Sequence, residues 1–215
     1  SVSADPAAFA AAINAVRAAS HRPLVLISDQ PEVISAGLRA IDGEQPLVYC
    51  ATTQNWQAMV EVAKQHQASL AVKGGSLDEL ADLTTKIKDA GLNDLVLAPV
   101  ARDMSSMLTL NTQIRRLALK KNFRALGYPL MAFPGDVGDE AHEQVLAAQA
   151  IAKYGGVIVL DHFAPEIVYP LLVLRENIYT DPQKPIQVQP GIYEINDPTP
   201  EDAVLVTTNF SITYF

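Results

Sequence analysis

The sequence predicts an α/β fold, a TIM-type (β/α) barrel that is incomplete on its N-terminal side. Short β-rich runs alternate with helical stretches along the chain, which is typical of serial βα units around a parallel sheet. The first three runs begin at residues 23, 46 and 69, a regular spacing. No G-x-G-x-x-G turn follows any run, so the repetition favours a barrel over an open doubly wound sheet.

Six runs are predicted to be strands. They are PLVLIS (23–28), PLVYCAT (46–52), SLAVKGG (69–75), DLVLAPV (94–100), YPLMAFPG (128–135) and GVIVLDHF (156–163). Six βα units are two short of a closed barrel. The remaining strands are therefore expected either before Ser1 or from another source.

Two helices are defined by apolar residues at i, i+3, i+4 and i+7 or a similar spacing. The helix after the second strand carries Trp56, Met59, Val60 and Ala63 on one face, and the next helix carries Leu80, Leu83, Ile87 and Ala90. Ser76 and Glu79 predict a capping box at the start of the second of these helices, and Gly91 predicts its end. Lys73-Gly74-Gly75-Ser76 lacks the spacing of a phosphate loop and indicates a tight βα turn.

The charge of the chain disfavours nucleic acid as a partner. The formal net charge is -8, whereas binding to a phosphate backbone requires clustered cations. The densest basic cluster consists of Arg115, Arg116, Lys120, Lys121 and Arg124. We expect this cluster to lie at the end of a helix, where cations are favoured by the helix dipole.

The cysteine and histidine content gives this segment no metal centre. Cys50 is the only cysteine, so neither an internal disulfide nor a four-cysteine iron-sulfur or zinc site forms within it. Cys50 stands in an apolar run and is expected to be a buried thiol. His21, His66 and His142 are dispersed without metal-binding spacing. With no apolar stretch of membrane-spanning length and no signal-peptide pattern at the N-terminus, a cytoplasmic location without membrane contact is expected.

The composition changes after the sixth strand, which predicts three parts. Residues 1–180 are expected to form the barrel, and residues 181–202 a Pro-rich linker that follows a last helix. Residues 203–215 begin with the β-rich run AVLVTTNF and are expected to start a second domain. Both ends of the chain are expected to be cut from a longer protein.

Candidate site residues lie at the carboxyl ends of the predicted strands, where barrels place their active sites. They are Ser28, Asp29, Thr52, Thr53, Lys73, Arg102, Asp103, Asp136, Asp161 and His162. Adjacent residues at a strand end point to opposite sides, so Asp161 and His162 are not expected to form one acid-base couple. Helix capping accounts for Asp29, Asp103 and Asp136, because each precedes a helix by a few residues. The residues alone therefore define no catalytic set.

Several segments resemble a known family. LRENIYTDPQKPIQVQPGIYEI and VLVTTNFSITYF, with QPLVYCATTQNWQAMVEVAKQHQASLAVKGG and DLVLAPV upstream, are similar to the large subunit of the corrinoid iron-sulfur protein, the gamma subunit of the acetyl-CoA decarbonylase/synthase complex. That family has an N-terminal [4Fe-4S] domain, a central TIM-type barrel and a C-terminal cobamide-binding domain. The resemblance covers the barrel and the first strand of the cobamide domain, so the cluster is expected outside this chain.

The resemblance implies that the intact protein carries a methyl group on cobalt, from methyltetrahydropterin to the acetyl-CoA synthase centre of the Wood-Ljungdahl pathway. The implied partners are a small corrinoid-protein subunit with its own barrel, a methyltetrahydrofolate-type methyltransferase and acetyl-CoA synthase. In that family, the threonines that correspond to Thr207 and Thr213 lie against the cobamide. Their even separation places both side chains on one face of a regular strand. The barrel itself is then mainly a scaffold.

An alternative of another class remains open, a pterin-binding methyltransferase barrel. In that hypothesis, carboxylates such as Asp29, Asp103 and Asp161 hold a pterin ring at the strand ends. The linker sequence favours the carrier subunit instead.

Overall fold

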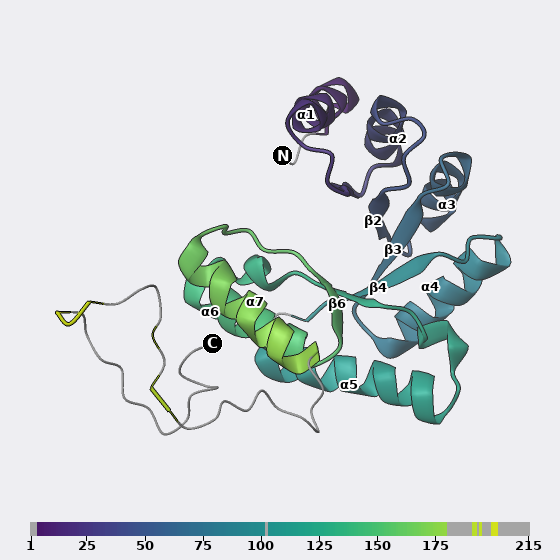
Figure 1. Cartoon of the computed structure of the whole chain (residues 1–215). Coiled ribbons are helices and arrows are strands. Elements are labelled where there is room, and N and C mark those ends of the chain that lie inside the picture. Colours follow the sequence, from purple (N-terminus) through teal and green to yellow (C-terminus); the bar gives the residue numbers. More distant parts are fainter. Residues whose placement is uncertain (1–3, 102, 180–190, 193, 195–198, 202–215) are drawn as a thin grey trace.

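The computed structural model describes residues 4–101, 103–179, 191–192, 194 and 199–201. Six parallel strands form one curled half-barrel sheet in the order β1-β2-β3-β4-β5-β6 (Figure 1). The strands are β1 (Val25–Ile27), β2 (Leu47–Ala51), β3 (Ser69–Gly74), β4 (Leu95–Pro99), β5 (Leu130–Ala132) and β6 (Gly155–Ile158). All six predicted strands are confirmed, each of them shorter than predicted. Because the order never reverses, a doubly wound sheet is excluded for this part of the chain.

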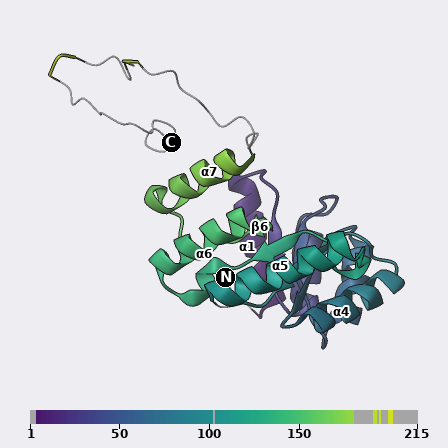
Figure 2. The ribbon, with the colours of Figure 1, turned by 90° about the horizontal axis from the view of Figure 1, so that it is seen from below.

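Helices connect the strands and cover the convex face of the sheet (Figure 1). They are α1 (Pro6–Ala19), α2 (Pro31–Ala40), α3 (Trp56–Gln65), α4 (Leu77–Asp89), α5 (Met104–Lys120), α6 (Glu140–Ala152) and α7 (Pro165–Tyr179), with the 3-10 turns η1 (Arg124–Leu126) and η2 (Pro134–Val137). α5, α6 and α7 follow one another side by side (Figure 2). The predicted basic cluster lies at the end of α5 and in the residues that follow it.

The two faces of the sheet have separate apolar clusters. Leu70 and Val72 of β3 belong to the main core under the helices, whereas Ala71 between them belongs to a smaller cluster on the concave face. This alternation follows from the period of two in a β-strand. The concave cluster is buried in the middle of the sheet, but Val25 and Ile27 of β1 remain 37% and 42% exposed.

The helix α1 was not predicted, although Asp5-Pro6 is a signal for its start. The Asp5 carboxylate accepts a hydrogen bond from Ala7 N at 3.0 Å, and Pro6 begins the helix, where a missing N–H costs nothing. Phe9 and Ile13 pack on Gly37 of α2 so closely that an added Cβ there would approach both to 2.7 Å. Gly37 therefore sets the distance between α1 and α2.

A proline interrupts the sheet between β4 and β5. Leu97 and Leu130 form the one registered pair of these two strands among the described residues. Leu97 N donates to Pro129 O at 2.8 Å, so by the alternation of a parallel ladder the next donor position of β4 that faces β5 is the nitrogen of Pro99. Pro99 has no N–H to donate, and the ladder ends there. The carboxyl ends of β4 and β5 consequently separate.

The ends of α4 confirm the predicted signals and refine one of them. Ser76 accepts a hydrogen bond from Glu79 N at 3.2 Å, as a capping box requires, but the Glu79 carboxylate accepts from Gly75 N at 2.8 Å rather than from Ser76 N. At the other end, Leu92 N donates to Ile87 O and Gly91 N donates to Lys88 O, with Gly91 at a φ of +92°. This is the Schellman arrangement, which favours glycine.

We expect Gly91→Ala to lower the free energy of unfolding by about 1 kcal/mol, because a Cβ is strained in the left-handed region. Gly75→Ala is the matched control, since its φ lies outside that region and the only contact of an added Cβ is Glu79 Oε2 at 3.7 Å. Urea denaturation of both variants measures the difference. Equal effects of the two substitutions would contradict the role assigned to Gly91.

Candidate functional site

The carboxyl ends of the strands lie at one edge of the sheet because all six strands are parallel. We call the residues at this edge the mouth. It contains Ser28 and Asp29 after β1, Thr52 and Thr53 after β2, Lys73 near the end of β3, Asp136 after β5, and Asp161 with His162 after β6. Arg102, Thr207 and Thr213 lie outside the described residues.

Asn55 ties together the ends of β1 and β2. Its Oδ1 accepts hydrogen bonds from Thr52 N at 2.7 Å and from Thr52 Oγ1 at 3.1 Å. Its Nδ2 donates to Asp29 O at 2.7 Å and to Cys50 O at 3.2 Å. Asn55 precedes α3 but makes no capping bond to it. The sequence gives no signal for this role, because the partners of Asn55 lie at the ends of β1 and β2 rather than on its own helix.

The capping interpretation is right for one of three aspartates. Asp103 caps α5 by accepting hydrogen bonds from Ser106 N and Ser106 Oγ, and these bonds hold the pKa of its carboxyl below the usual range. Asp29 does not cap α2, because Gln30 occupies that position without a side-chain bond. Asp136 lies within η2, and Asp139 caps α6 in its place. Asp29 and Asp136 are both exposed, so their carboxylates face solvent at the mouth.

His162 pairs with a buried glutamate rather than with Asp161. Its Nδ1 lies 2.5 Å from Oε2 of Glu143, a residue of α6 that is fully buried. Glu143 Oε1 accepts from Asp161 N at 2.5 Å and, at 3.4 Å, from His162 N. Burial raises the pKa of Glu143, but the hydrogen bonds from His162 and from the two backbone N–H groups outweigh it and leave that pKa lowered. The hydrogen bond to Glu143 raises the pKa of His162.

Asp161 packs closely against Gly135 and forms no ion pair with another described residue. A Cβ added at Gly135 would lie 2.5 Å from Cγ of Asp161, so the carboxyl group lies directly over this glycine. Gly135 therefore lets the β6 end approach η2. The expectation that Asp161 and His162 form no acid-base couple agrees with this arrangement, since the His162 ring faces Glu143.

A small cavity opens at the mouth between β4 and β5. Its volume is about 80 Å³, and its lining includes Tyr49, Lys73, Asn111, Phe133 and Asp136. The Tyr49 and Phe133 rings lie with centroids 4.5 Å apart, and the Lys73 ammonium lies 5.9 Å from the Tyr49 centroid. Burial is the main cause of the raised pKa of Tyr49, and the negative charge of Asp136 raises it further.

The predicted buried thiol is confirmed. Cys50 is 3% exposed, and burial raises the pKa of its thiol even though the charge of Lys73 opposes this. A raised pKa keeps the sulfur protonated at neutral pH, where a thiol is neither a good nucleophile nor a metal ligand. Among the described residues, no group of three or more His, Cys, Asp or Glu side chains is placed to hold a metal ion.

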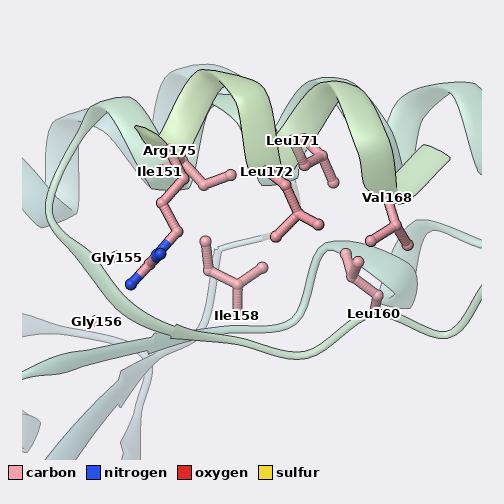
Figure 3. A pocket seen from close by; sticks show the side chains of 9 residues that line it. All are labelled: Ile151, Gly155, Gly156, Ile158, Leu160, Val168, Leu171, Leu172 and Arg175. Atoms are coloured by element: carbon pink, nitrogen blue, oxygen red, sulfur yellow. The ribbon is translucent and has the colours of Figure 1, made fainter. Parts of the chain in front are cut away.

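A larger cavity, of about 290 Å³, lies under α7 (Figure 3). Leu171 and Leu172 of α7 face Ile158 of β6 across it, and the glycines of β6 form its floor. Arg175 extends over one end. Its lining is predominantly apolar, so it lacks the convergent polar groups that orient a small ligand.

Comparison with known proteins decides the family. A family model described as CO dehydrogenase/acetyl-CoA synthase delta subunit matches residues 1–215. The chain belongs to this family. Proteins similar to it include the corrinoid/iron-sulfur protein large subunit of Moorella thermoacetica, 44% identical over 211 residues, which are 98% of this chain and 47% of that protein. The acetyl-CoA decarbonylase/synthase complex subunits gamma of Archaeoglobus fulgidus and Methanosarcina acetivorans are each 34% identical, over 99% and 100% of this chain and 48% of their own lengths.

The family assignment confirms the resemblance drawn from LRENIYTDPQKPIQVQPGIYEI and VLVTTNFSITYF. The chain spans about half the length of the curated relatives it matches. In the part of the chain that the structure describes, no helix is both long and apolar enough to cross a membrane.

We expect Asn55→Ala to lower the free energy of unfolding by about 2–3 kcal/mol. The substitution leaves the carbonyls of Asp29 and Cys50 and the N–H of Thr52 without their side-chain partner. The groups of Thr52 and Cys50 are partly buried, and leaving such groups unpaired is costly. Gln54→Ala, at the exposed neighbouring position, is the control and should change stability little. Urea denaturation measures the free energy of unfolding of both variants. A loss in Asn55→Ala no larger than that in Gln54→Ala would show that Asn55 does not hold the ends of β1 and β2 together.

The His162–Glu143 pair predicts a pH-dependent stability. The raised pKa of His162 gives a stabilisation that is complete below its ordinary value of 6.5 and is lost as pH rises through the folded-state pKa. The lowered pKa of Glu143 gives a stabilisation present above 4.5 that is lost as pH falls through its folded-state pKa. His162→Gln should therefore destabilise the protein most between about pH 4.5 and 6.5 and less on either side. Thermal unfolding across pH, with His66→Gln as control, measures this window, and a pH-independent loss would contradict the pair.

Proposed function

We propose that the chain is the central part of a corrinoid methyl carrier, whose intact form moves a methyl group on cobalt between methyltetrahydropterin and the acetyl-CoA synthase centre. The match of the family model along the whole chain carries this proposal. The names of the relatives, which combine corrinoid and iron-sulfur with acetyl-CoA decarbonylase/synthase, support it. Its partners are then a small corrinoid-protein subunit, the pterin-dependent methyltransferase and acetyl-CoA synthase, and its location is the cytoplasm.

The half-barrel sheet is, in this proposal, six strands of a TIM-type barrel that the parent protein completes. The consecutive strand order and the exposure of Val25 and Ile27 on the concave side of β1 support it, since a neighbouring strand and its side chains would cover that face. The outer edges of β1 and β6 have no partner strand among the described residues, and such edges also give the parent a reason to associate with its partner.

The described residues do not fit either implied cofactor. A [4Fe-4S] cluster needs four cysteines and the sequence has one, so the cluster belongs to another part of the parent. The cavity under α7, at about 290 Å³, is the larger of the two cavities described above. It is lined mainly by aliphatic side chains and does not fit a cobamide. We assign the cobamide contacts to Thr207 and Thr213, on the resemblance alone, and the half-barrel acts as scaffold. The cobamide supplies the methyl chemistry when bound.

The Thr207 and Thr213 assignment is tested by cobamide retention in the full-length protein. We expect Thr207→Val and Thr213→Val each to weaken retention by about 1 kcal/mol, or roughly fivefold, the scale of one lost hydrogen bond to a buried partner. Thr208→Val, on the opposite face of a regular strand, is the control. The visible spectrum after gel filtration measures occupancy, and an unchanged double variant would remove both threonines from the site.

The carrier function itself is tested with methyl-labelled methyltetrahydrofolate and the methyltransferase. The label should co-elute with the cobamide-loaded full-length protein and then pass to acetyl-CoA synthase. Labelling of the protein freed of cobamide would contradict a carrier role, and so would binding of methyltetrahydrofolate in the absence of the methyltransferase, which the pterin-barrel alternative requires.

A further inference from the structure

A group of cations at the end of α5 has no part in the function proposed above. We call it the basic patch, and it consists of Arg115, Arg116, Lys120, Lys121 and Arg124. α5 crosses from the carboxyl end of β4 to the amino end of β5, so its last turn lies at the edge of the sheet opposite the mouth. A protein segment that binds the basic patch therefore leaves the mouth open.

The cations of the basic patch lack acidic partners. Residues 104–135 contain no Asp or Glu, and none of the five side chains forms a salt bridge or hydrogen bond with another described residue. Lys86 of α4 shows the usual arrangement of an exposed helical lysine, because it pairs with Asp82 one turn before it at 2.6 Å. The positive charge of the basic patch is thus available to an external anion.

The helix dipole accounts for only part of the basic patch. Its effect is confined to the last turn of a helix, where it favours Lys120. Arg116 lies one turn earlier, four residues before Lys120, and like charges at this spacing repel each other. Arg124 lies beyond α5, in the turn η1 that packs against it. A bound carboxylate would relieve the repulsion between these cations.

Two large apolar side chains are exposed within the basic patch. Leu119 of α5 is 65% exposed, and Phe123, which follows the helix, is 44% exposed. Leu119 lies three residues after Arg116, so the two side chains are neighbours on the surface of α5. A phosphate backbone has no use for such apolar groups, whereas a protein segment with acidic and apolar side chains complements both features of the surface.

The charge of the rest of the chain restricts how far the bound acidic region can extend. Five of the 16 basic residues lie in the basic patch but none of the 24 acidic residues, so the remainder of the chain has a formal net charge of -13. Duplex DNA or an anionic membrane would extend over this acidic remainder and be repelled by it. A short acidic segment meets the basic patch alone and is steered toward it by the same field.

We propose that the basic patch is a docking surface for a partner protein, which it binds through a short segment of acidic and apolar side chains. The carboxylates of this segment pair with Arg116, Lys120 and Arg124, and its apolar side chains cover Leu119 and Phe123. The chemistry of the surface is independent of the methyl-carrier function, whereas the choice of the partner among the proteins named above rests on that proposed function.

A fluorescent peptide of glutamates and leucines tests the surface of the full-length protein by fluorescence anisotropy. We expect saturable binding that weakens as salt is raised, and about tenfold weaker binding by the double variant Lys120→Glu, Arg124→Glu. Lys86→Glu is the matched control and should bind as the wild-type protein does. Leu119→Ser should weaken binding of this peptide about threefold and leave binding of a glutamate–serine peptide unchanged.

Three results of this experiment would overturn the proposal. They are equal binding by the double variant and the Lys86→Glu control, equal loss of both peptides in Leu119→Ser, and tighter binding of duplex DNA or of phosphatidylserine vesicles than of the peptide.

Association with the small subunit, the methyltransferase and acetyl-CoA synthase identifies the partner. We expect one of the three to bind the double variant about tenfold more weakly than the wild-type protein and to bind Lys86→Glu normally. If all three bind the wild-type protein and the double variant equally well, the docking proposal is wrong while the proposed function stands. No association of the wild-type protein with any of them would contradict the proposed function and the docking proposal with it. A wild-type dimer that the double variant loses would assign the basic patch to a second copy and overturn the proposal.

Discussion

Hydrogen bonding between consecutive parallel strands is the constraint on which the rest of the structure depends. Each strand pairs with the strands directly before and after it, so every connection must cross from the carboxyl end of one strand to the amino end of the next. The helices that make these crossings cover the convex face. The same constraint places all carboxyl ends at one mouth, and the polar residues gathered there are a consequence of topology before they are a sign of chemistry.

The features of the fold that depend on local interactions can be predicted from the sequence. Strands and helices follow from the spacing of apolar residues, and the ends of α4 follow from hydrogen bonds between residues at most a few positions apart. The serial strand order also follows, since evenly spaced βα units have few alternatives. Where local signals compete, prediction becomes weaker. Asp29 and Asp136 both precede helices, but the lengths of the loops give the cap positions to Gln30 and Asp139.

Contacts between distant segments are not predictable from a single sequence. Asn55 is chemically an ordinary helix-start residue, and only the folded chain brings the Asp29 carbonyl to its side chain. The role of Glu143 is equally hard to predict from the sequence. A glutamate in the first turn of a helix is normally solvated, whereas Glu143 is fully buried beneath His162. Both residues bind backbone at the mouth, so the ends of β1, β2 and β6 are held by side chains from the start of α3 and from α6.

The break in the pairing of β4 with β5 also has a local cause and a distant effect. Pro99 is visible in the sequence, but which neighbour its missing N–H would face depends on the register of β3 against β4. Gly74 pairs with Pro99, and Val100 N donates to Gly74 O, so the bonds to β3 come from the residues that flank Pro99. The proline leaves the β3 side intact and opens only the β5 side. A strand shifted by one residue would place the break between β3 and β4, away from Met107 and Asn111 of α5. The polar cavity therefore depends on register as much as on the residues that line it.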